Sequence, residues 1–364
     1  MKERLMTVWT LALIASILLL LFTVRRKFPK RRAKPVAIVL EIGLVLCMTF
    51  RVVFPVLPAP APTGPEAVRV DTVYYKHETA YPDMATEGKE REIPVHVYHP
   101  EKMRQGAHPL FLFSHGAFGV GTSNETLFRE LASRGYVVMS LDHPHHAFFS
   151  KLSTGKTVFA DRTFLNEVIR SQGSEDLETA LADLNRWIDP RIEDIDFVMD
   201  KIFDDKADNA YEGMIDRRQV ILSGHSLGGG AVLAVGRARP EDVKALVVLE
   251  APFVKDIEGV EGDGYKFTPT PYPRPILHIY SDALWGKTGA IPTYARNEEL
   301  IQAKDPKFEN RHVKGVGHVG LTDLSRISPI LTDQIDGGLD KRKAPQTLLE
   351  INRMVIEYLE TVEK

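Results

Sequence analysis

One short motif carries the residue types that nucleophilic catalysis requires. The run GHSLGG, residues 224–229, follows an apolar β-branched run and precedes an alanine-rich apolar run. Glycines allow a strand to turn sharply into a helix, and such a turn lifts the serine hydroxyl above the sheet at the helix N-terminus. The spacing therefore predicts that Ser226 is a nucleophile. It also predicts that the backbone N–H of Leu227 is one donor to a developing oxyanion.

A second oxyanion donor is expected on the loop after an earlier strand. The run LFLFSHGAFG, residues 110–119, is an apolar strand followed by a His-Gly turn. We predict that the backbone N–H of Ala117 is this donor. His115, in the same turn, is interpreted as a hydrogen-bonding residue that stabilises the turn and not as a catalyst.

The general base should be a histidine that follows the serine and lies on a loop after the last strand. Of the twelve histidines, only His278, His312 and His318 follow Ser226. His278 lies inside an apolar strand run, and His312 lies in the approach to a glycine-rich turn. His318, within KGVGHVG, has the flexible surroundings that let an imidazole reach a serine, so His318 is the predicted base.

Two carboxylates could orient this histidine and stabilise its charged form. Glu250 ends the run LVVLE, and Asp282 follows the next strand run, LHIYS. Either position suits the acid of a Ser-His-acid triad, so the residues alone leave both open.

Seven short runs should build the sheet that positions these groups. Residues 70–75 and 93–98 have the pattern of early strands, and continuous apolar runs follow at 110–114, 136–142, 220–224, 244–250 and 276–281. Continuous apolar runs are typical of strands covered on both faces. The sequence therefore predicts an α/β fold with a mostly parallel sheet and helices on both faces.

Helical patterns separate these runs. A capping box, TSNE at residues 122–125, predicts a helix that stops near Gly135. An insert at about 148–215 contains two predicted helices separated by Pro190, and part of residues 148–173 could be a lid or binding wall as well as a cover for the sheet. The last helix is predicted over 347–359.

The run DHPHH, residues 142–146, brings three imidazoles and a carboxylate together, a composition that could hold zinc. Because it follows a strand directly, we interpret it as a substrate-side loop. No metal or organic cofactor is predicted. The single cysteine, Cys47, excludes an intrachain disulfide and a thiolate zinc cage.

The N-terminus predicts a membrane anchor over residues 1–57. Residues 6–24 form a 19-residue run without a charge, long enough to cross a bilayer, and residues 36–57 form a second candidate span that contains Glu41 and Arg51. A cleavable signal peptide is the rival for the first run, and a surface or re-entrant segment is the rival for the second. Residues 58–65, rich in proline, read as a stiff tether before a catalytic domain at 66–364.

Charge is distributed unevenly along the chain. Residues 1–60 hold ten Lys and Arg against two acidic residues, whereas the remainder holds 36 against 47, a net charge of −11. This asymmetry favours a basic membrane-facing end and argues against nucleic-acid binding.

Seven basic residues lie between the two apolar runs: Arg25, Arg26, Lys27, Lys30, Arg31, Arg32 and Lys34. The positive-inside rule places this loop in the cytoplasm. The catalytic domain is then extracytoplasmic if both runs span, and cytoplasmic if only the first does.

Together the motifs resemble the serine hydrolases of the α/β-hydrolase superfamily, and within it the platelet-activating factor acetylhydrolase and dienelactone hydrolase-like group. The resemblance covers roughly residues 60–360 and rests on SHGAFG, ASRGYVVMSLDHP, RIEDIDFVMDKI, GHSLGGGA, LVVLEAP, LHIYSDALW and GVGHVG. It implies an α/β-hydrolase fold. In the acetylhydrolases the acid is an aspartate at the position matched by Glu250, whereas bacterial polyester hydrolases and cutinases place it near Asp282. The resemblance therefore favours Glu250.

The implied activity is hydrolysis of carboxylic esters, lipid-like or short-acyl, by a membrane-anchored serine hydrolase through an acyl-enzyme. The expected partners are a small ester substrate and the membrane. Two other classes stay open: a serine peptidase or amidase with the same triad, and a non-catalytic membrane protein on a hydrolase fold.

Overall fold

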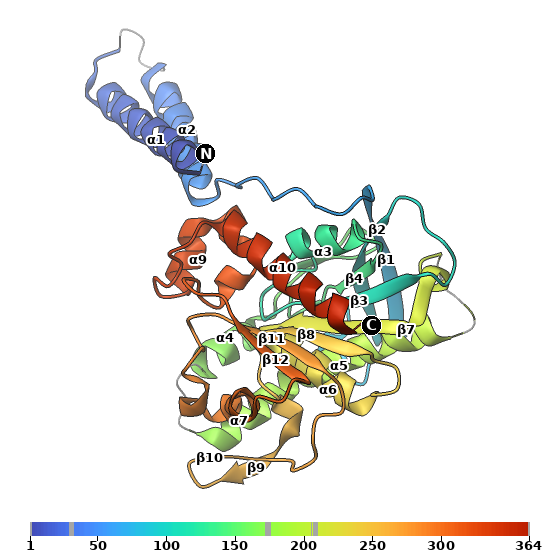
Figure 1. Cartoon of the computed structure of the whole chain (residues 1–364). Helices are drawn as coiled ribbons and strands as arrows, with labels where there is room; N and C mark the ends of the chain where they lie inside the picture. Colours follow the sequence, from blue (N-terminus) through green and yellow to red (C-terminus); the bar gives the residue numbers. More distant parts are fainter. Residues whose placement is uncertain (1, 29–32, 172–175, 205, 207–209, 363–364) are drawn as a thin grey trace.

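An eight-stranded sheet forms the centre of the molecule in this computed structural model, which describes residues 2–28, 33–171, 176–204, 206 and 210–362 (Figure 1). The strand order is β1-β2-β4-β3-β7-β8-β11-β12. The first two pairs, β1 with β2 and β2 with β4, are antiparallel, and every later pair is parallel. The strands are β1 (Val68–Glu78), β2 (Glu90–Pro100), β3 (His108–Ser114), β4 (Val137–Leu141), β7 (Ile215–His225), β8 (Ala245–Leu249), β11 (Ile276–Tyr280) and β12 (Phe308–His312).

All seven predicted strand runs lie in this sheet, so the prediction of a mostly parallel α/β sheet is confirmed. The eighth strand, β12, was not predicted. Its sequence is FENRH, and all five residues are only partly buried because β12 pairs with β11 alone at the edge of the sheet. An edge strand needs no continuous apolar run, which is the pattern that identified the others.

Helices cover both faces of the sheet. Along β3, Leu110 and Leu112 pack into the core beneath α5 (Leu177–Phe203) and α6 (Ser226–Ala238), whereas Phe111 and Phe113 pack against α3 (Glu125–Ala132) and α10 (Ala344–Val362). All four side chains are fully buried. Burial of a side chain of this size contributes about 1.5–3 kcal/mol. The period-2 alternation thus builds two cores, one on each face.

The remaining elements surround the ends of the strands. The last helix, predicted over 347–359, is confirmed as α10, with Leu348, Ile351, Val355 and Leu359 buried. Other helices and two small sheets complete the domain: α4 (Arg162–Ser171), α7 (Ala295–Ala303), α8 (Leu324–Ile327), α9 (Pro329–Ile335), β5 (Phe149–Lys151) with β6 (Thr157–Phe159), and β9 (Ile257–Glu261) with β10 (Gly264–Phe267). The described residues also form the short 3-10 helices η1 (Pro82–Met84), η2 (Glu212–Met214), η3 (Val254–Asp256), η4 (Thr288–Ala290), η5 (Pro292–Tyr294) and η6 (Val319–Leu321).

One helix prediction and one capping prediction were wrong. The insert contains one long helix, α5, that runs through Pro190 and not two helices separated by it. Buried residues on both sides of the proline, Ile188 and Arg191, keep one continuous buried face, and this packing outweighs the lost backbone hydrogen bond. At α3 the expected capping box is absent: Asn124 makes no side-chain cap, and Asp323 accepts from the N–H of Thr126 instead.

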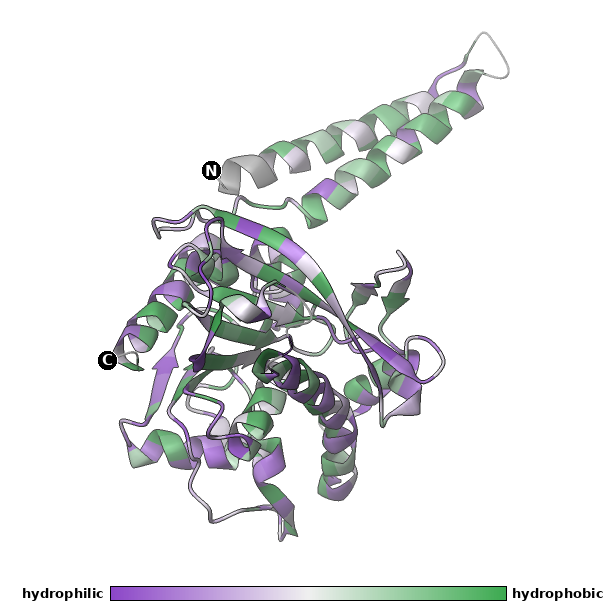
Figure 2. Cartoon of the chain, turned by 90° about the vertical axis from the view of Figure 1, so that its right-hand side faces the viewer, coloured by the Kyte–Doolittle hydropathy of each residue, from purple (hydrophilic) through white to green (hydrophobic). Residues whose placement is uncertain are grey.

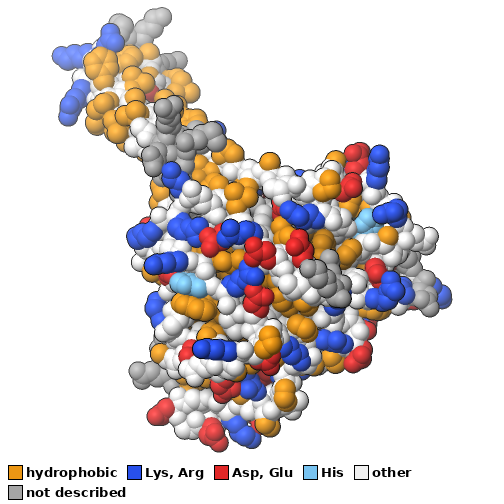
Figure 3. All heavy atoms as spheres, viewed as in Figure 1, with side chains coloured by type: hydrophobic (Ala, Val, Ile, Leu, Met, Phe, Trp, Pro, Cys, Tyr) orange, Lys and Arg blue, Asp and Glu red, His pale blue; other side chains and the backbone are white. Residues whose placement is uncertain are grey.

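The two N-terminal helices, α1 (Lys2–Arg25) and α2 (Ala33–Val53), pack together as a hairpin that projects from the domain. Both are long and apolar enough to cross a membrane, and their surface is largely hydrophobic (Figures 2 and 3). Glu41 accepts a hydrogen bond from Thr23 at 2.8 Å, and the guanidinium of Arg51 lies 4.7 Å from the centre of the Trp9 ring. Each charge in α2 therefore has a partner on α1.

Basic side chains gather at the far end of this hairpin (Figure 3). Arg25, Arg26, Lys27 and Lys34 belong to this group, whereas Lys30, Arg31 and Arg32 lie outside the described residues. The second helix begins at Ala33 and ends at Val53, short of the predicted limit at residue 57.

The proline-rich segment lies against the catalytic domain. The backbone N–H of Leu57 donates to the carbonyl of Arg326 at 2.7 Å, and Leu57 is 2% exposed. The backbone N–H of Thr63 donates to the Glu130 carboxylate at 2.8 Å, and its hydroxyl donates to the same group at 2.6 Å. Residues 57–63 are therefore held to the domain at both ends, and the segment predicted as a stiff tether contacts the domain.

Candidate active site

The serine of the GHSLGG motif lies where β7 passes directly into α6. Ser226 is the first residue of α6, and its φ is 54°, a left-handed conformation that only a constrained turn imposes on a residue with a side chain. Gly228 is required by close approach, because a Cβ there would lie 2.2 Å from the carbonyl oxygen of Ser114. The turn is therefore packed directly against the end of β3.

The two predicted oxyanion donors belong to residues that line one cavity. Ala117 and Leu227 line it together with Ser226. Leu227 is in the first turn of α6, where backbone N–H groups have no partner within the helix. The N–H of Ala117 has no hydrogen-bond acceptor in the part of the chain that the structure describes. Both donors are therefore available to a ligand.

The predicted base and one candidate acid meet directly. The distance between Nδ1 of His318 and Oε2 of Glu250 is 2.6 Å. Glu250 is fully buried, and its carboxylate also accepts from the N–H and the hydroxyl of Ser281, each at 2.8 Å from Oε1. These bonds fix the carboxylate, so that it holds the imidazole in one orientation.

The other candidate acid has different partners. One oxygen of Asp282 lies 2.7 Å from Nε2 of His312, and the other accepts from the backbone N–H of Gly315 at 2.8 Å. Its side chain is 31% exposed. Asp282 thus supports the loop that leads to His318, and Glu250 contacts the imidazole itself.

His225 connects the serine turn to the His318 loop. Its ring centre lies 4.5 Å from that of His318, and its Nε2 donates to the backbone carbonyl of His318 at 3.1 Å. Because His225 is the residue before Ser226, this contact brings the His318 loop to the serine turn. The tautomer with a proton on Nε2 satisfies this bond.

Opposing effects act on the pKa of His318. Burial of the ring lowers it, but the hydrogen bond that the ring donates to Glu250, the charge of Glu250 and the charge of Asp336 together raise the pKa above its ordinary 6.5. Glu250 is therefore the main group that stabilises the imidazolium.

Two aspartates that the sequence analysis did not identify hold the His318 loop. Asp336 accepts from the backbone N–H groups of Val319 at 2.9 Å and Gly320 at 2.8 Å, and Asp340 accepts from that of Gly317 at 3.3 Å. Burial, together with the adjacent carboxylate of Asp336, raises the pKa of Asp340 to about 7. No local motif marks these residues, because they act only through the fold of α9 and the turn after it.

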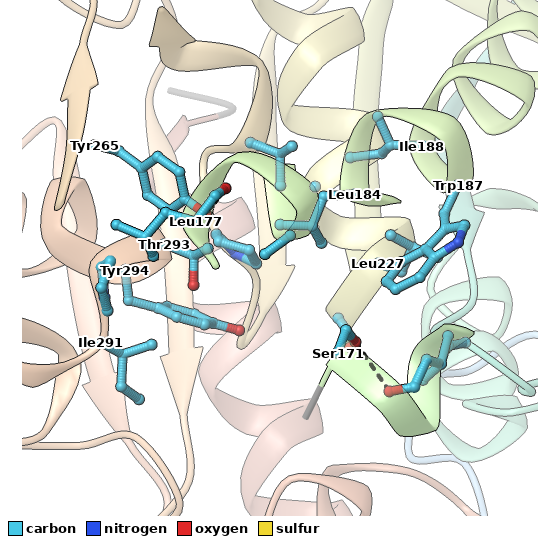
Figure 4. Close-up of a pocket in the computed structure, with 18 of the residues that line it drawn as sticks. Ser171, Leu177, Leu184, Trp187, Ile188, Leu227, Tyr265, Ile291, Thr293 and Tyr294 are labelled. Carbon is cyan, nitrogen blue, oxygen red and sulfur yellow. Dashed lines mark hydrogen bonds between the residues drawn. The ribbon is translucent and has the colours of Figure 1, made fainter. Parts of the chain in front are cut away.

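The cavity beside Ser226 has a volume of about 620 Å³ (Figure 4). Trp187 and Ile188, from α5, lie across it from Tyr265 and Tyr294. None of its described lining residues is charged. Most are apolar, and they include Ala117, Val168, Leu177, Ala180, Leu184, Trp187, Ile188, Leu227, Pro252, Val254, Ala290, Ile291 and Pro292.

Part of the insert forms a wall of this cavity. Val168 and Ser171 of α4 line it, as do residues of α5, which agrees with the binding-wall interpretation of the segment 148–173. Residues 172 and 173 lie outside the described residues. The insert therefore supplies much of the surface that a substrate would contact.

The histidines of residues 142–146 do not line this cavity. His143 and His146 are fully buried behind the His115-Gly116 turn, where Nδ1 of His143 lies 2.7 Å from Asp194. The interpretation as a substrate-side loop was wrong, because the loop folds inward under α5. By contrast, His115 stabilises its turn as predicted, with Nδ1 donating to the Gly116 carbonyl at 2.7 Å.

Comparison with solved structures finds the same architecture elsewhere. A ferulic acid esterase from Streptomyces cinnamoneus is 18% identical, with a TM-score of 0.60 over 83% of this chain and 91% of that one. A dienelactone hydrolase-like promiscuous phosphotriesterase from metagenomic libraries is 13% identical, with a TM-score of 0.50 over 81% of this chain and 99% of that one. At such low identity these likenesses establish the fold.

A family comparison covers the site itself. Residues 111–336 match the alpha/beta hydrolase family, and this range includes Ser226, Glu250 and His318. The match extends over more than half of the chain. The resemblance found in the motifs is thus confirmed at the level of the superfamily, and the chain belongs to the alpha/beta hydrolase family.

Proposed function

We propose that this protein is a membrane-anchored serine hydrolase that cleaves carboxylic esters with an uncharged, apolar acyl group. The observation that carries the proposal is the hydrogen bond from the His318 ring to the buried carboxylate of Glu250, beside a serine held in a strained strand-to-helix turn. Backbone strain of this kind is characteristic of functional sites. The apolar cavity that opens at Ser226 supports an ester with an apolar acyl group as the substrate.

In the proposed reaction, Oγ of Ser226 attacks the ester carbonyl carbon while Nε2 of His318 accepts the serine proton. Glu250 keeps the proton on Nδ1 directed toward itself, which leaves Nε2 free to act as the base. The N–H groups of Ala117 and Leu227 donate to the oxyanion of the tetrahedral intermediate. His318 then gives its proton to the leaving alkoxide, which departs as the alcohol, and an acyl-enzyme remains.

Water completes the cycle by the same route. His318 accepts a proton from water as the hydroxide attacks the acyl carbonyl, and it returns that proton to Ser226 as the carboxylic acid leaves. His318 carries the proton in both halves of the reaction, and the N–H groups of Ala117 and Leu227 donate to the oxyanion in each.

The cavity supports an apolar acyl group because its described lining contains no charge that could pair with a carboxylate or an ammonium group. Burial of each additional methylene contributes at most about 0.8 kcal/mol, which is about fourfold in kcat/KM. We therefore expect kcat/KM to rise from acetyl through butyryl to octanoyl esters.

A p-nitrophenyl ester series on the full-length protein in detergent tests this proposal. Octanoyl should be cleaved faster than acetyl, whereas the monosuccinyl ester and matched p-nitroanilides should be poor substrates. Leu184→Trp, which fills part of the cavity, should reduce octanoyl turnover more than acetyl turnover. No turnover of any ester by folded protein would overturn the proposal, and faster cleavage of the anilides would favour an amidase.

The N-terminal hairpin supports a membrane location with the catalytic domain outside the cytoplasm. Two helices of membrane-spanning length with basic residues at the connecting end favour a topology in which that end is cytoplasmic and both the N-terminus and the domain lie on the other side. In a Cys47→Ser background, Arg218→Cys introduces one thiol at a side chain that is 86% exposed. A membrane-impermeant maleimide should label it in intact cells, and labelling only after lysis would contradict this orientation.

A further inference from the structure

The insert helix α5 places a buried cation behind the oxyanion turn, residues 115–117, which ends at the predicted donor Ala117. Arg191 is fully buried, and its Nη1 donates to the backbone carbonyl of His115 at 2.5 Å. Its Nη2 lies 3.5 Å from the carbonyl oxygen of Gly116, and its Nε lies 3.3 Å from Nδ1 of His146. The guanidinium thus reaches two successive carbonyls immediately before Ala117.

This cation does not form a direct ion pair with any described carboxylate. Asp194, the carboxylate whose charge acts on Arg191, is occupied by Arg91 at 2.6 and 2.7 Å and by Nδ1 of His143 at 2.7 Å. The other ring nitrogen of His143 lies 2.8 Å from the hydroxyl of Ser114. Burying a charge without an ion pair lowers the stability of the folded protein. The burial of Arg191 against these carbonyls therefore requires a reason other than stability.

The reason lies in the geometry of one peptide unit. The carbonyl of Gly116 and the N–H of Ala117 belong to the same peptide group. Donors on that carbonyl, Nδ1 of His115 at 2.7 Å and Nη2 of Arg191 at 3.5 Å, polarise the group and strengthen its N–H as a donor. They also fix the direction of that N–H.

We propose that Arg191 is a positioning residue for ester hydrolysis: its guanidinium holds the His115 and Gly116 carbonyls so that the N–H of Ala117 is aimed at the oxyanion. The inference rests on the proposed function. Arg191 touches neither the serine nor the substrate cavity, and it acts only through the turn.

A matched pair of variants tests this role. Arg191→Lys and Arg91→Lys both keep a positive charge at a fully buried position in the same cluster. Both replace the planar guanidinium, which can donate to two acceptors at once, with a single ammonium group. Arg91 contacts the carbonyls of Met84 and Pro144 but not the oxyanion turn. Removal of an oxyanion donor lowers kcat by about 10²- to 10³-fold, so misdirection of one by Arg191→Lys should lower kcat by about 10- to 100-fold.

The readout separates positioning from stability. In Arg191→Lys, KM should stay within about threefold of wild type, and the affinity for a trifluoromethyl ketone, which mimics the tetrahedral intermediate, should fall by the same factor as kcat/KM. Arg91→Lys should leave both nearly unchanged per folded molecule, even if its melting temperature falls. Equal kcat values in the two variants would overturn the inference while leaving the proposed function intact.

The wild-type protein supplies an independent measurement if Arg191→Lys does not fold. In a crystal structure of the phosphonate adduct, a phosphoryl oxygen should lie within hydrogen-bond distance of the N–H of Ala117, with Arg191 still on the turn carbonyls. An adduct on Ser226 whose oxygen avoids Ala117 would refute the positioning role alone. An unreactive Ser226 would instead refute the proposed function.

Discussion

Glu250→Gln tests the assignment of the acid. The glutamine keeps the shape of the side chain and removes the charge from a fully buried group that lies 2.6 Å from Nδ1 of His318. A hydrogen bond to a charged group is worth about 1.5–3 kcal/mol, which corresponds to a loss of about 10- to 150-fold in kcat/KM. If the amide donates to Nδ1 and imposes the wrong tautomer, the loss approaches about 10⁴-fold, as for the corresponding change in a serine protease triad.

The pH dependence of kcat/KM tests the same assignment, because it predicts the direction in which the acidic limb of the profile moves. A general base must be neutral, so activity should rise with pH through the pKa of His318, which lies above 6.5 in the folded protein. Glu250→Gln removes the charge, and with it the charge-assisted hydrogen bond, that raise this pKa. The acidic limb of the kcat/KM profile should therefore move to lower pH as its plateau falls.

Asp282→Asn is the matched control. Because Asp282 contacts His312 and Gly315, its substitution should change kcat/KM by less than about threefold and leave the acidic limb in place. Initial rates with a p-nitrophenyl ester between pH 5 and 9 measure all three proteins. The reasoning is refuted if Glu250→Gln keeps the wild-type rate and profile, or if Asp282→Asn reproduces the loss.

Three further substitutions test the packing around the site and the contact of the proline-rich tether with the domain. Asp340→Asn should raise the free energy of unfolding more at pH 8 than at pH 5. Burial and the neighbouring Asp336 raise the pKa of Asp340 to about 7 in the folded protein, against about 3.8 in the unfolded chain. Ionisation of Asp340 therefore destabilises the wild-type protein as the pH rises, and the asparagine removes this effect. Equal effects in urea titrations at the two pH values would contradict this. Gly228→Ala places a Cβ 2.2 Å from a backbone oxygen and should destabilise by about 1–3 kcal/mol or more, whereas at Gly213 a Cβ would meet nothing within 4 Å, so Gly213→Ala is the control. Similar melting temperatures for the two glycine variants would rule out the close approach. Thr63→Val removes a hydroxyl that donates to a buried carboxylate of α3 and should cost about 1 kcal/mol, with Thr63→Ser restoring it. Unchanged stability would show that the bond from the Thr63 hydroxyl to Glu130 does not stabilise the domain.

Local patterns were sufficient to predict the parts of the fold that depend on neighbours in sequence. The central strands are continuous apolar runs because both faces are covered, so their pattern was visible without the structure. The turn at Ser226 was equally visible, since a strand, glycines and a helix must adjoin there. The hydrogen bond between Glu250 and His318 was not, because the residues alone allowed Asp282 the same role.

Features that depend on distant residues were missed or misread. The proline at position 190 predicts a helix end, but packing along the whole buried face of α5 carries the helix through it. The cap of α3 comes from Asp323, far away in the chain. The cluster at residues 142–146 contained the right residue types for a site, yet only the fold shows that it lies beneath Arg191 and Asp194.

Labelling by a fluorophosphonate probe tests the central claim most directly. The claim is that the hydroxyl of Ser226 is activated by the imidazole of His318. Mass spectrometry of the full-length protein after reaction should find one adduct, on Ser226, and the adduct should be lost in His318→Ala while the circular dichroism spectrum stays unchanged. An adduct on another residue, or a Ser226 adduct that forms equally fast in His318→Ala, would contradict the account.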